Sequence, residues 1–577
     1  MRGELWRAMW QVMLIVIVVD SGTNVGVSLA ADEDPRPNVL LVMTDDQGWG
    51  DFGFHDNPHV KTPHLDELAR QSVELTRFHV SPVCSPTRAS LMTGRYNYRT
   101  GAIDTFLGRS TMAADEVTLA EMFAAAGYRT GIFGKWHLGD NYPSRASDQG
   151  FAESLVHRGG GMVQPADPPG GSYFDPVLVR NGREENSRGY CSDVFTDAAI
   201  DFVTRHKSEP FFAYLAFNAP HTPLQLPEEY LKPYQGLGLS DETARVYGMV
   251  TNIDDNVGRL LAKLAELEID RRTIVVFLTD NGPQSRRFNG VLRDTKGSVF
   301  DGGIRAPCLV RWPGHFPAGA KVERTAAHID LAPTLLAAAG VKTPANVKFD
   351  GISLLGDLRG DSTASPERLL FFQWHRGDEP VRNRACAVRG PRYKLVQPAG
   401  RGDQQRNQVD WALFDMTVDP GEQRNLIDEQ PAIAAEMKAA YDRWFADVGA
   451  TRGYPAPRII AGTRHENPLT LTRQDWRGPR AGWGAEALGH WDVEIAAAAT
   501  YDVTARTASA DHQRTVRLKI GEDEKLAKLE AGADRVTFAD LKLPAGTTRV
   551  EAIVEYDGRQ AGAHYVDLDC RDPIAAE

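Results

Sequence analysis

The chain has 577 residues, of which 42% are hydrophobic and 25% charged, so it is long and apolar enough to form two or three folded domains. Its formal net charge of −12 argues against nucleic acid as a partner, because an acidic surface repels a polyanion. An anionic substrate would have to be attracted by a local pocket of lysine, arginine and metal.

The first 30 residues are typical of a signal peptide. Two arginines precede an apolar run over residues 8–19, and a Ser-Leu-Ala sequence ending at Ala30 suits cleavage. A membrane anchor is the weaker interpretation, because the run is too short to span a bilayer. We therefore expect a secreted or periplasmic protein with a signal peptide over residues 1–30 and no stable membrane span.

Residues 36–350 are predicted to form an α/β domain, because helix-like and strand-like segments alternate there. Continuous apolar runs predict buried strands over residues 38–43, 129–133, 211–217 and 273–278. Helices are predicted from Pro63, from Leu119, from Asp193 and over residues 244–267. Thr118 and Glu121 have the spacing of a capping box, which supports the second of these helices.

The pattern changes at residue 351, where short strands follow one another closely and a helix closes the group. The predicted strands are residues 369–374, 385–388, 393–396 and 413–414, and the helix is 432–445. This predicts a smaller α+β subdomain over residues 351–450. A Pro/Arg/Gly-rich linker is expected over 451–468, and the alternating pattern that follows predicts a β-sandwich accessory domain over 469–577.

The accessory domain contains aromatic residues that leave two interpretations open. They are Trp476, Trp483, Trp491 and Tyr501. Exposed rings would stack on a carbohydrate, whereas buried rings would fill the core of the domain itself. The second interpretation is slightly favoured.

Polar residues follow each of the four predicted strands of the first domain. They are Asp45-Asp46, Lys135-Trp136-His137, Asn218 to His221, and Asp280-Asn281. In an open α/β sheet, ligands bind at the carboxyl ends of the strands. Four such strand ends therefore indicate a single site.

The acidic strand ends predict a metal site. Asp45, Asp46, Asp280 and Asn281 offer mainly oxygen atoms, and clustered carboxylates do not easily stay ionised together without a cation. Oxygen-rich sets suit a hard ion such as Ca²⁺ or Mg²⁺. Each pair alone is also a common turn sequence, but their occurrence at two strand ends favours metal.

Cys84 opens a predicted helix, with Pro86 near its first position and Gly94 beyond its end. A group at position 84 therefore faces free backbone N–H groups, which suits an anion. An inert buried thiol and a thiolate nucleophile with a pKa lowered by Arg88 are the alternatives. The chain has five cysteines and no metal-type C-x-x-C spacing, and the odd count leaves at least one unpaired.

Four further residues would supply positive charge and proton transfer at this site. They are Lys135, His137, His221 and Lys296. A lone histidine after a strand is more often a surface loop residue, and Lys296 could equally be a solvated loop lysine. Together with Arg88 and the carboxylates they predict a metal-assisted hydrolase that acts on an anionic ester.

Residues 84–95, CSPTRASLMTGR, resemble the type I sulfatase signature, whose C-x-P-x-R core is read by the enzymes that generate formylglycine. Residues 131–139 resemble the second signature of that family. Further family motifs follow in the family's order: Asp45-Asp46, residues 218–223, residues 280–282, and Lys296-Gly297 through residues 302–305. The resemblance covers roughly residues 38–426.

The resemblance implies an alkaline-phosphatase-like mixed sheet flanked by helices, a smaller α+β subdomain, and catalysis by formylglycine at position 84. A formylglycine-generating enzyme or an anaerobic maturase would convert Cys84. One hydroxyl of the hydrated aldehyde would attack the sulfur of a sulfate ester. The implied ligands of calcium are Asp45, Asp46, Asp280, Asn281 and residue 84.

The resemblance also implies roles for the cationic residues. His137 would take a proton from the second hydroxyl so that sulfate leaves, while Arg88 and Lys135 would stabilise the ionised diol. His221 and Lys296 would bind the sulfate, and one of them would protonate the leaving oxygen.

The chain departs from the common family pattern at a few positions, which puts the substrate class in doubt. They are Asp294-Thr295, Asp301 and Ala306. A sulfated carbohydrate is the expected substrate, with a small aryl or steroid sulfate still open. The alternatives to a sulfatase are a phosphoester or phosphonate hydrolase of the same superfamily and a glycan-binding protein without activity.

Overall fold

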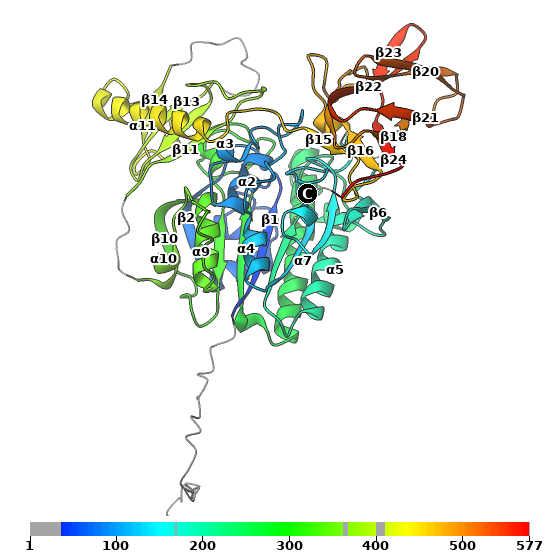
Figure 1. Ribbon diagram of the computed structural model, residues 1–577. Helices are drawn as coiled ribbons and strands as arrows, with labels where there is room; N and C mark the ends of the chain where they lie inside the picture. The colour runs from blue at the N-terminus through cyan, green and yellow to red at the C-terminus, as the bar shows by residue number, and fades with distance from the viewer. Residues whose placement is uncertain (1–35, 165, 168–169, 362–366, 400–409, 576–577) are drawn as a thin grey trace, which may run out of the picture. The chain divides into compact units, whose positions relative to one another are not determined.

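The computed structural model describes residues 36–575 except 165, 168–169, 362–366 and 400–409 (Figure 1). The predicted signal peptide, residues 1–30, lies outside the described residues. Within the described residues, no helix combines the length and the apolar character needed to cross a membrane. All five cysteines are described, and each is buried with a free thiol, so the predicted site residue Cys84 has no disulfide partner.

A mixed sheet of ten strands contains the four strands that the sequence predicts, and these four are parallel neighbours. In spatial order they are β8 (Thr273–Thr279), β1 (Asn38–Thr44), β7 (Phe211–Ala216) and β3 (Arg129–Lys135). Every residue of β1 and β8 is buried, as expected of parallel strands covered on both faces. Lys135, predicted to follow its strand, is the last residue of β3.

Six further strands extend this sheet. Beyond β8 lie β9 (Cys308–Arg311), β2 (Val73–His79) and β10 (Lys321–Ala327), and beyond β3 lie β4 (Glu153–His157), β5 (Val177–Arg180) and β6 (Arg183–Asn186). β5, β6 and β9 run antiparallel to their neighbours, which makes the sheet mixed. The expected mixed α/β fold is therefore confirmed.

The side chains of β1 alternate between two hydrophobic cores. Val39, Leu41 and Met43 belong to one core, and Leu40 and Val42 to the other, because successive strand residues point to opposite faces. The first core is covered by α2 (Cys84–Thr93), α4 (Leu119–Ala125) and α9 (Leu331–Ala338), and the second by α1 (Pro63–Gln71), α5 (Cys191–Arg205) and α7 (Asp241–Glu266) (Figure 1). The short helices are α3 (Asn97–Thr100), α6 (Glu228–Leu231), α8 (Asp301–Ile304) and α10 (Leu355–Arg359).

The predicted helices from Pro63 and Leu119 begin at those residues, and the capping box of Thr118 and Glu121 is present. α5 begins two residues before the expected Asp193. The antiparallel group after residue 351 is also found. It comprises β11 (Leu370–Gln373), β12 (Cys386–Arg389), β13 (Tyr393–Gln397), β14 (Ala412–Asp415) and α11 (Pro431–Ala450).

Two sheets at the end of the chain share one hydrophobic core, which is a β-sandwich arrangement. One holds β15 (Ile459–Ala461), β17 (Trp491–Ile495), β22 (Gly546–Tyr556), β19 (Arg514–Ile520), β20 (Asp523–Leu529) and β23 (Arg559–Gly562). The other holds β16 (Leu469–Thr472), β24 (Tyr565–Cys570), β18 (Ala499–Arg506) and β21 (Arg535–Leu543). We call residues 459–570 the C-terminal β region.

β15 lies inside the predicted linker, residues 451–468, because it pairs in parallel with β17 and so joins the sandwich. The linker is therefore shorter than predicted. The other domain boundaries stay predictions. Of the four aromatic residues, Trp476, Trp491 and Tyr501 are fully buried in the sandwich core, whereas the side chain of Trp483 is 46% exposed.

Candidate active site

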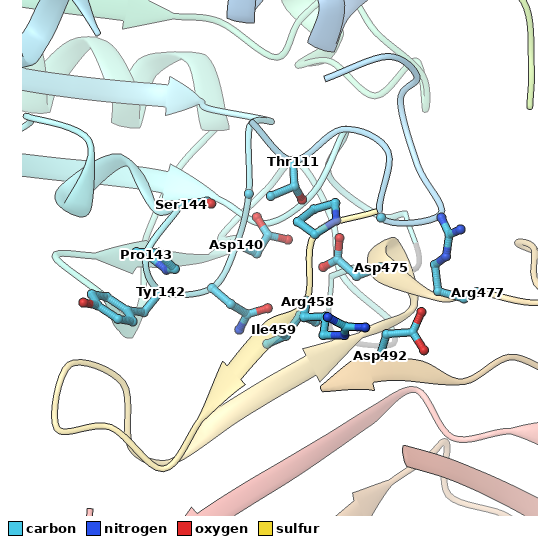
Figure 2. A pocket seen from close by; sticks show the side chains of 14 residues that line it. Thr111, Asp140, Tyr142, Pro143, Ser144, Arg458, Ile459, Asp475, Arg477 and Asp492 are labelled. Carbon is cyan, nitrogen blue, oxygen red and sulfur yellow. The ribbon is translucent and has the colours of Figure 1, made fainter. Parts of the chain in front are cut away.

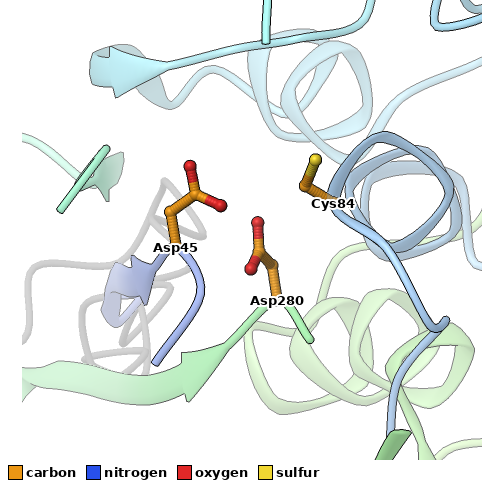
Figure 3. A group of neighbouring side chains, drawn as sticks. All are labelled: Asp45, Cys84 and Asp280. Atoms are coloured by element: carbon orange, nitrogen blue, oxygen red, sulfur yellow. The ribbon is translucent and has the colours of Figure 1, made fainter. Parts of the chain in front are cut away.

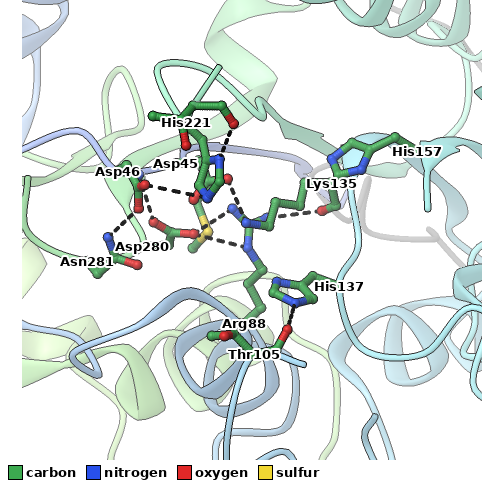
Figure 4. Close-up of polar contacts among 12 residues, drawn as sticks. Asp45, Asp46, Arg88, Thr105, Lys135, His137, His157, His221, Asp280 and Asn281 are labelled. Carbon is green, nitrogen blue, oxygen red and sulfur yellow. Dashed lines mark hydrogen bonds and ion pairs between the residues drawn. The ribbon is translucent and has the colours of Figure 1, made fainter. Parts of the chain in front are cut away.

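The carboxyl ends of β8, β1, β7 and β3 meet at one edge of the sheet, because these strands are parallel neighbours. Figure 4 shows the polar side chains of these strand ends gathered in one group. Lys135 Nζ donates to Asp45 Oδ2 at 2.6 Å, and Lys296 Nζ donates to Asp46 Oδ1 at 2.5 Å. Because both carboxylates are fully buried, each needs a compensating charge.

Cys84 is the first residue of α2, as predicted, and the left-handed Gly94 (φ 66°) ends this helix. The Cys84 sulfur and one oxygen each of Asp45 and Asp280 lie within 4.8 Å of one another (Figure 3). All ten residues of α2 are buried, so the side chain at position 84 is held by a rigid element. The structure thus places the candidate nucleophile beside the candidate metal ligands.

The thiol of Cys84 is a poor nucleophile in this setting. Burial raises its pKa, an effect that Lys135 and Lys296 reduce without reversing. The thiol therefore stays protonated at neutral pH, and only a thiolate is strongly nucleophilic. The protein side chains alone therefore do not generate a thiolate at position 84.

Three buried oxygen atoms in this group have no hydrogen-bond partner among the described residues: Asp45 Oδ1, Asp46 Oδ2 and Asn281 Oδ1. Buried acceptors are normally satisfied, so these three oxygen atoms fit the ligands of a cation. Burial and the neighbouring Asp45 charge raise the pKa of Asp280 to about 6, as expected of crowded carboxylates. An all-oxygen set of this kind fits a hard divalent cation.

Arg88 fixes the orientation of Asp280. Its Nη2 and Nε donate to Asp280 Oδ2 at 2.7 and 3.2 Å, and its Nη1 donates to the carbonyl oxygen of Lys135 at 3.0 Å. Arg88 and Asp280 are both fully buried, so the pair forms a fixed part of the site. The predicted role of Arg88 toward a diol stays a prediction.

His137 is held with one ring nitrogen free. Its Nε2 donates to the carbonyl oxygen of Thr105 at 2.8 Å, while the buried Nδ1 has no partner among the described residues. Burial, aided by Lys135, holds the pKa of His137 well below its usual range, so the ring is neutral. The Thr105 carbonyl selects the tautomer with the proton on Nε2, which leaves Nδ1 able to accept a proton.

His221 is also neutral, because burial lowers its pKa to about 4. Its Nδ1 donates to the carbonyl oxygen of Thr222 at 2.7 Å, and its Nε2 lies 3.6 Å from Asp46 Oδ2. His221 and Lys296 therefore both contact Asp46, as expected if they face a common anion beside the metal ligands.

A cavity of about 100 Å³ opens onto this group. We call its predicted lining residues, Cys84, His137, His221 and Lys296, the floor, and Thr105, Trp374, Arg376 and Trp483, which also line it, the wall. None of the positions that depart from the family pattern, Asp294-Thr295, Asp301 and Ala306, is among the lining residues. Asp301 instead pairs with buried Lys394 at 2.6 Å.

The sequence interpretation missed Gln474, which comes from the C-terminal β region. Its Nε2 donates to the Thr105 carbonyl oxygen at 2.8 Å and to Ser110 Oγ at 3.1 Å. The same carbonyl therefore accepts from both His137 and Gln474. No local pattern marks this glutamine, since Thr105 lies 369 positions earlier in the chain.

A second cavity, of about 30 Å³, lies between the loop over residues 139–144 and the C-terminal β region (Figure 2). Asp140 and Asp475 both line it, and none of the predicted site residues does. Burial, with a contribution from Asp140, raises the pKa of Asp475 to about 8. The lining mixes these two acids with Arg458 and Arg477, so the cavity does not define a site for an anion.

The fold and this strand-end site define a hydrolase of the alkaline-phosphatase-like class. The sulfatase family profile matches residues 37–341, which include all the predicted site residues. A second profile, described as N-sulphoglucosamine sulphohydrolase, C-terminal, matches residues 294–443. The chain belongs to the sulfatase family.

Individual relatives agree with this assignment. The chain is 34% identical to arylsulfatase A of Bos taurus over 459 residues, covering 70% of this chain and 86% of the relative. It is 32% identical to N-acetylgalactosamine-6-sulfatase of Sus scrofa over 401 residues, covering 64% and 73%. The solved structure of Ps i-CgsB in complex with k-i-k-neocarrahexaose superposes with a TM-score of 0.65 at 28% identity, covering 73% of this chain and 95% of that one.

Proposed function

We propose that this sulfatase releases sulfate from a sulfated carbohydrate, using formylglycine at position 84 and a bound calcium ion. The observation that carries this proposal is the position of Cys84, at the start of a buried helix and within 4.8 Å of Asp45 and Asp280 oxygen atoms. Burial raises the pKa of the unmodified thiol, so the protein side chains alone do not activate it. The hydrated aldehyde offers a different chemistry, because one of its two hydroxyls attacks sulfur and the other allows sulfate to leave as the aldehyde re-forms.

The surrounding residues fit the steps of this reaction. One hydroxyl, which gives its proton to solvent beside the positive charges of Lys135 and Arg88, attacks sulfur as the bond between sulfur and the alcohol oxygen breaks. The alcohol leaves with a proton from Lys296, because the one N–H of neutral His221 is bonded to the Thr222 carbonyl oxygen. The neutral His137 then accepts the proton of the second hydroxyl at Nδ1. The aldehyde re-forms as its bond to the sulfate oxygen breaks, and water regenerates the hydrate. Lys135 and Arg88 supply positive charge beside the ionised diol.

Asp45, Asp46, Asp280 and Asn281, with residue 84, are the proposed calcium ligands, and Mg²⁺ is the alternative ion. A divalent cation at this place would neutralise the crowded carboxylates and polarise the sulfate oxygens. The three unpartnered buried oxygen atoms support this assignment, and their support does not depend on the proposed reaction.

We expect Asp46→Asn to weaken calcium binding about 10- to 100-fold, measured by isothermal titration calorimetry on chelator-treated protein. Asp46 has a left-handed backbone (φ 63°), which asparagine tolerates, so the fold should be kept. The matched control is Asp255→Asn. Asp255 belongs to a second acidic group, with His64 and Asp254, and its side chain is 45% exposed. Equal calcium affinity in Asp46→Asn and the wild type would contradict the site.

The carbohydrate substrate is proposed from the relatives and from the pocket. One relative is named as an N-acetylgalactosamine-6-sulfatase, and the Ps i-CgsB structure contains k-i-k-neocarrahexaose. Aromatic and cationic side chains in the pocket wall suit a polar ring that carries negative charge. The interpretation of a glycan-binding protein without activity is weaker, because the whole polar set of the site is present.

The competing activity is hydrolysis of a phosphoester or phosphonate. A phosphonate monoester hydrolase of Agrobacterium radiobacter shares the fold, with a TM-score of 0.53 at 21% identity. We expect calcium-loaded protein to release sulfate from members of a panel of sulfated saccharides and to turn over an aryl sulfate faster than the matching aryl phosphate. Preference for the phosphate would reject the proposed activity in favour of the competing one.

Secretion or periplasmic location is proposed from the signal-peptide pattern of residues 1–30. The maturation partner is proposed from the C-x-P-x-R sequence at Cys84, and it is either a formylglycine-generating enzyme or an anaerobic maturase.

A further inference from the structure

The C-terminal β region holds one of the loops that surround the active site. Gly108 N donates to the Gln474 carbonyl oxygen at 3.2 Å, and Arg477 Nη1 donates to the Leu107 carbonyl oxygen at 2.8 Å. Leu107 also packs against the sandwich core. The loop that carries Thr105 is therefore fixed by residues from the far end of the chain.

Trp483 lies between β16 and β17 and lines the same cavity as Cys84 and His137. Its side chain is 46% exposed, whereas Trp476 and Trp491 of the same region are fully buried. An exposed tryptophan in a pocket wall leaves a large apolar face in water, which is unfavourable unless a ligand covers it. The core-filling role that was favoured for these aromatic residues therefore does not apply to Trp483.

The wall around Trp483 is held in place by ring contacts and hydrogen bonds. The Trp483 ring meets the Phe106 ring edge-on, with centroids 5.4 Å apart. The Arg376 guanidinium lies 4.5 Å from the Phe106 ring centre and 5.0 Å from that of Trp374. Arg376 Nη1 in turn donates to Asp104 Oδ1 at 2.7 Å and to Thr105 Oγ1 at 2.8 Å. Such a wall needs little reorganisation when a ligand binds.

We propose that Trp483 of the C-terminal β region is a specificity-determining residue, which stacks on a sugar ring of the leaving group of the substrate. The inference rests on the proposed function, because it names the part of the carbohydrate that the pocket wall binds. Sugar rings present C–H groups on one face, and a flat indole face is suited to cover them. Arg376 adds a cationic donor beside this face for hydroxyl or sulfate groups of the same saccharide.

The test compares Trp483→Ala and Trp483→Phe with the wild type on a sulfated di- or oligosaccharide chosen from the panel. We expect kcat/KM to fall about tenfold for Trp483→Ala and less for Trp483→Phe, because phenylalanine keeps an aromatic face. Inhibition by inorganic sulfate should be unchanged, because sulfate reaches the floor of the pocket and not its wall. The matched control is Leu526→Ala on β20, another exposed apolar side chain (61%) of the C-terminal β region that does not line the cavity.

A binding measurement separates this inference from the proposed function. Calorimetric titration of the same saccharide into Cys84→Ala and Cys84→Ala/Trp483→Ala should give a dissociation constant about tenfold higher for the double variant. Equal saccharide affinities of the two variants would overturn the inference. A loss of inorganic sulfate binding as large as the loss of saccharide binding in the double variant would also overturn it. Saccharide binding that depends on Trp483 in a protein that releases no sulfate would reject the proposed function and leave the subsite standing.

Discussion

Cys84→Ser is expected to lower sulfate release by at least about 10³-fold when the protein is produced in a bacterial host without serine-type maturation. Serine gives no hydrated aldehyde there, so the site loses its nucleophile. The fold should not change, because serine fits the space of a buried cysteine at the start of α2. Activity is measured with an aryl sulfate and with the best saccharide of the panel.

Mass spectrometry of the tryptic peptide over residues 78–88 provides the chemical readout for this variant. The active wild-type protein should contain the aldehyde form of residue 84, and the variant should contain unmodified serine. Ser85→Ala, next to Cys84 in the same helix but outside the proposed machinery, should keep the aldehyde in the peptide. If the wild-type protein is active while its peptide still carries the thiol at residue 84, the formylglycine mechanism is rejected.

Lys135→Met is expected to lower the free energy of unfolding by about 3 kcal/mol and kcat by about 10²- to 10³-fold. Lys135 and Asp45 are fully buried and form a hydrogen-bonded ion pair at 2.6 Å. Methionine fills a similar volume, so the loss comes mainly from the buried Asp45 charge that remains without its partner. Urea unfolding measures the first quantity and steady-state kinetics the second.

Lys263→Met is the matched control for this substitution. Lys263 pairs with Glu266 on α7 at 2.6 Å, and that pair is open to solvent, with Glu266 65% exposed. Exposed pairs contribute little to stability, so the change should stay within about 0.5 kcal/mol and leave kcat as in the wild type. If Lys135→Met and Lys263→Met change the free energy of unfolding by the same amount, the charge balance inferred for the strand ends is wrong.

The central part of the site could be predicted because its signals are local. Buried parallel strands are continuous apolar runs, and polar residues directly after such runs stand out, as at Asp45 and Asp280. Periodicity could not give the spatial order β8-β1-β7-β3, which is what brings these strand ends together. The ordered family motifs supplied that information indirectly.

There is a physical reason why the sequence could not predict the edge strands of the sheets. The exposed strand β6 carries mostly charged side chains, and β20 has one buried residue, so neither shows an apolar pattern. Such segments become strands by pairing with a neighbour that the sequence does not name. The position of Arg376 and Trp483 in the pocket wall could not be predicted either, because both reach it only through tertiary packing.

One signal in the sequence would have separated Trp483 from the other aromatic residues. Trp491 begins an alternating strand whose inward positions are buried, whereas Trp483 lies between Gly482 and Gly484, outside any strand. A tryptophan flanked by glycines has no sheet neighbours to cover it. The core-filling interpretation was therefore sound for Trp476 and Trp491 and wrong for Trp483.

The hydrogen bond from Gln474 to the Thr105 carbonyl has a consequence for how this enzyme is divided into parts. The Thr105 carbonyl oxygen orients the ring of His137. It also accepts a hydrogen bond from Gln474, which lies in the last quarter of the chain. A protein shortened to end before β15 would keep all the polar residues of the strand ends. It would lack Gln474, one of the two donors to the Thr105 carbonyl. During synthesis, the polar residues of the strand ends are therefore made well before the residue that completes the hydrogen bonds of the Thr105 carbonyl.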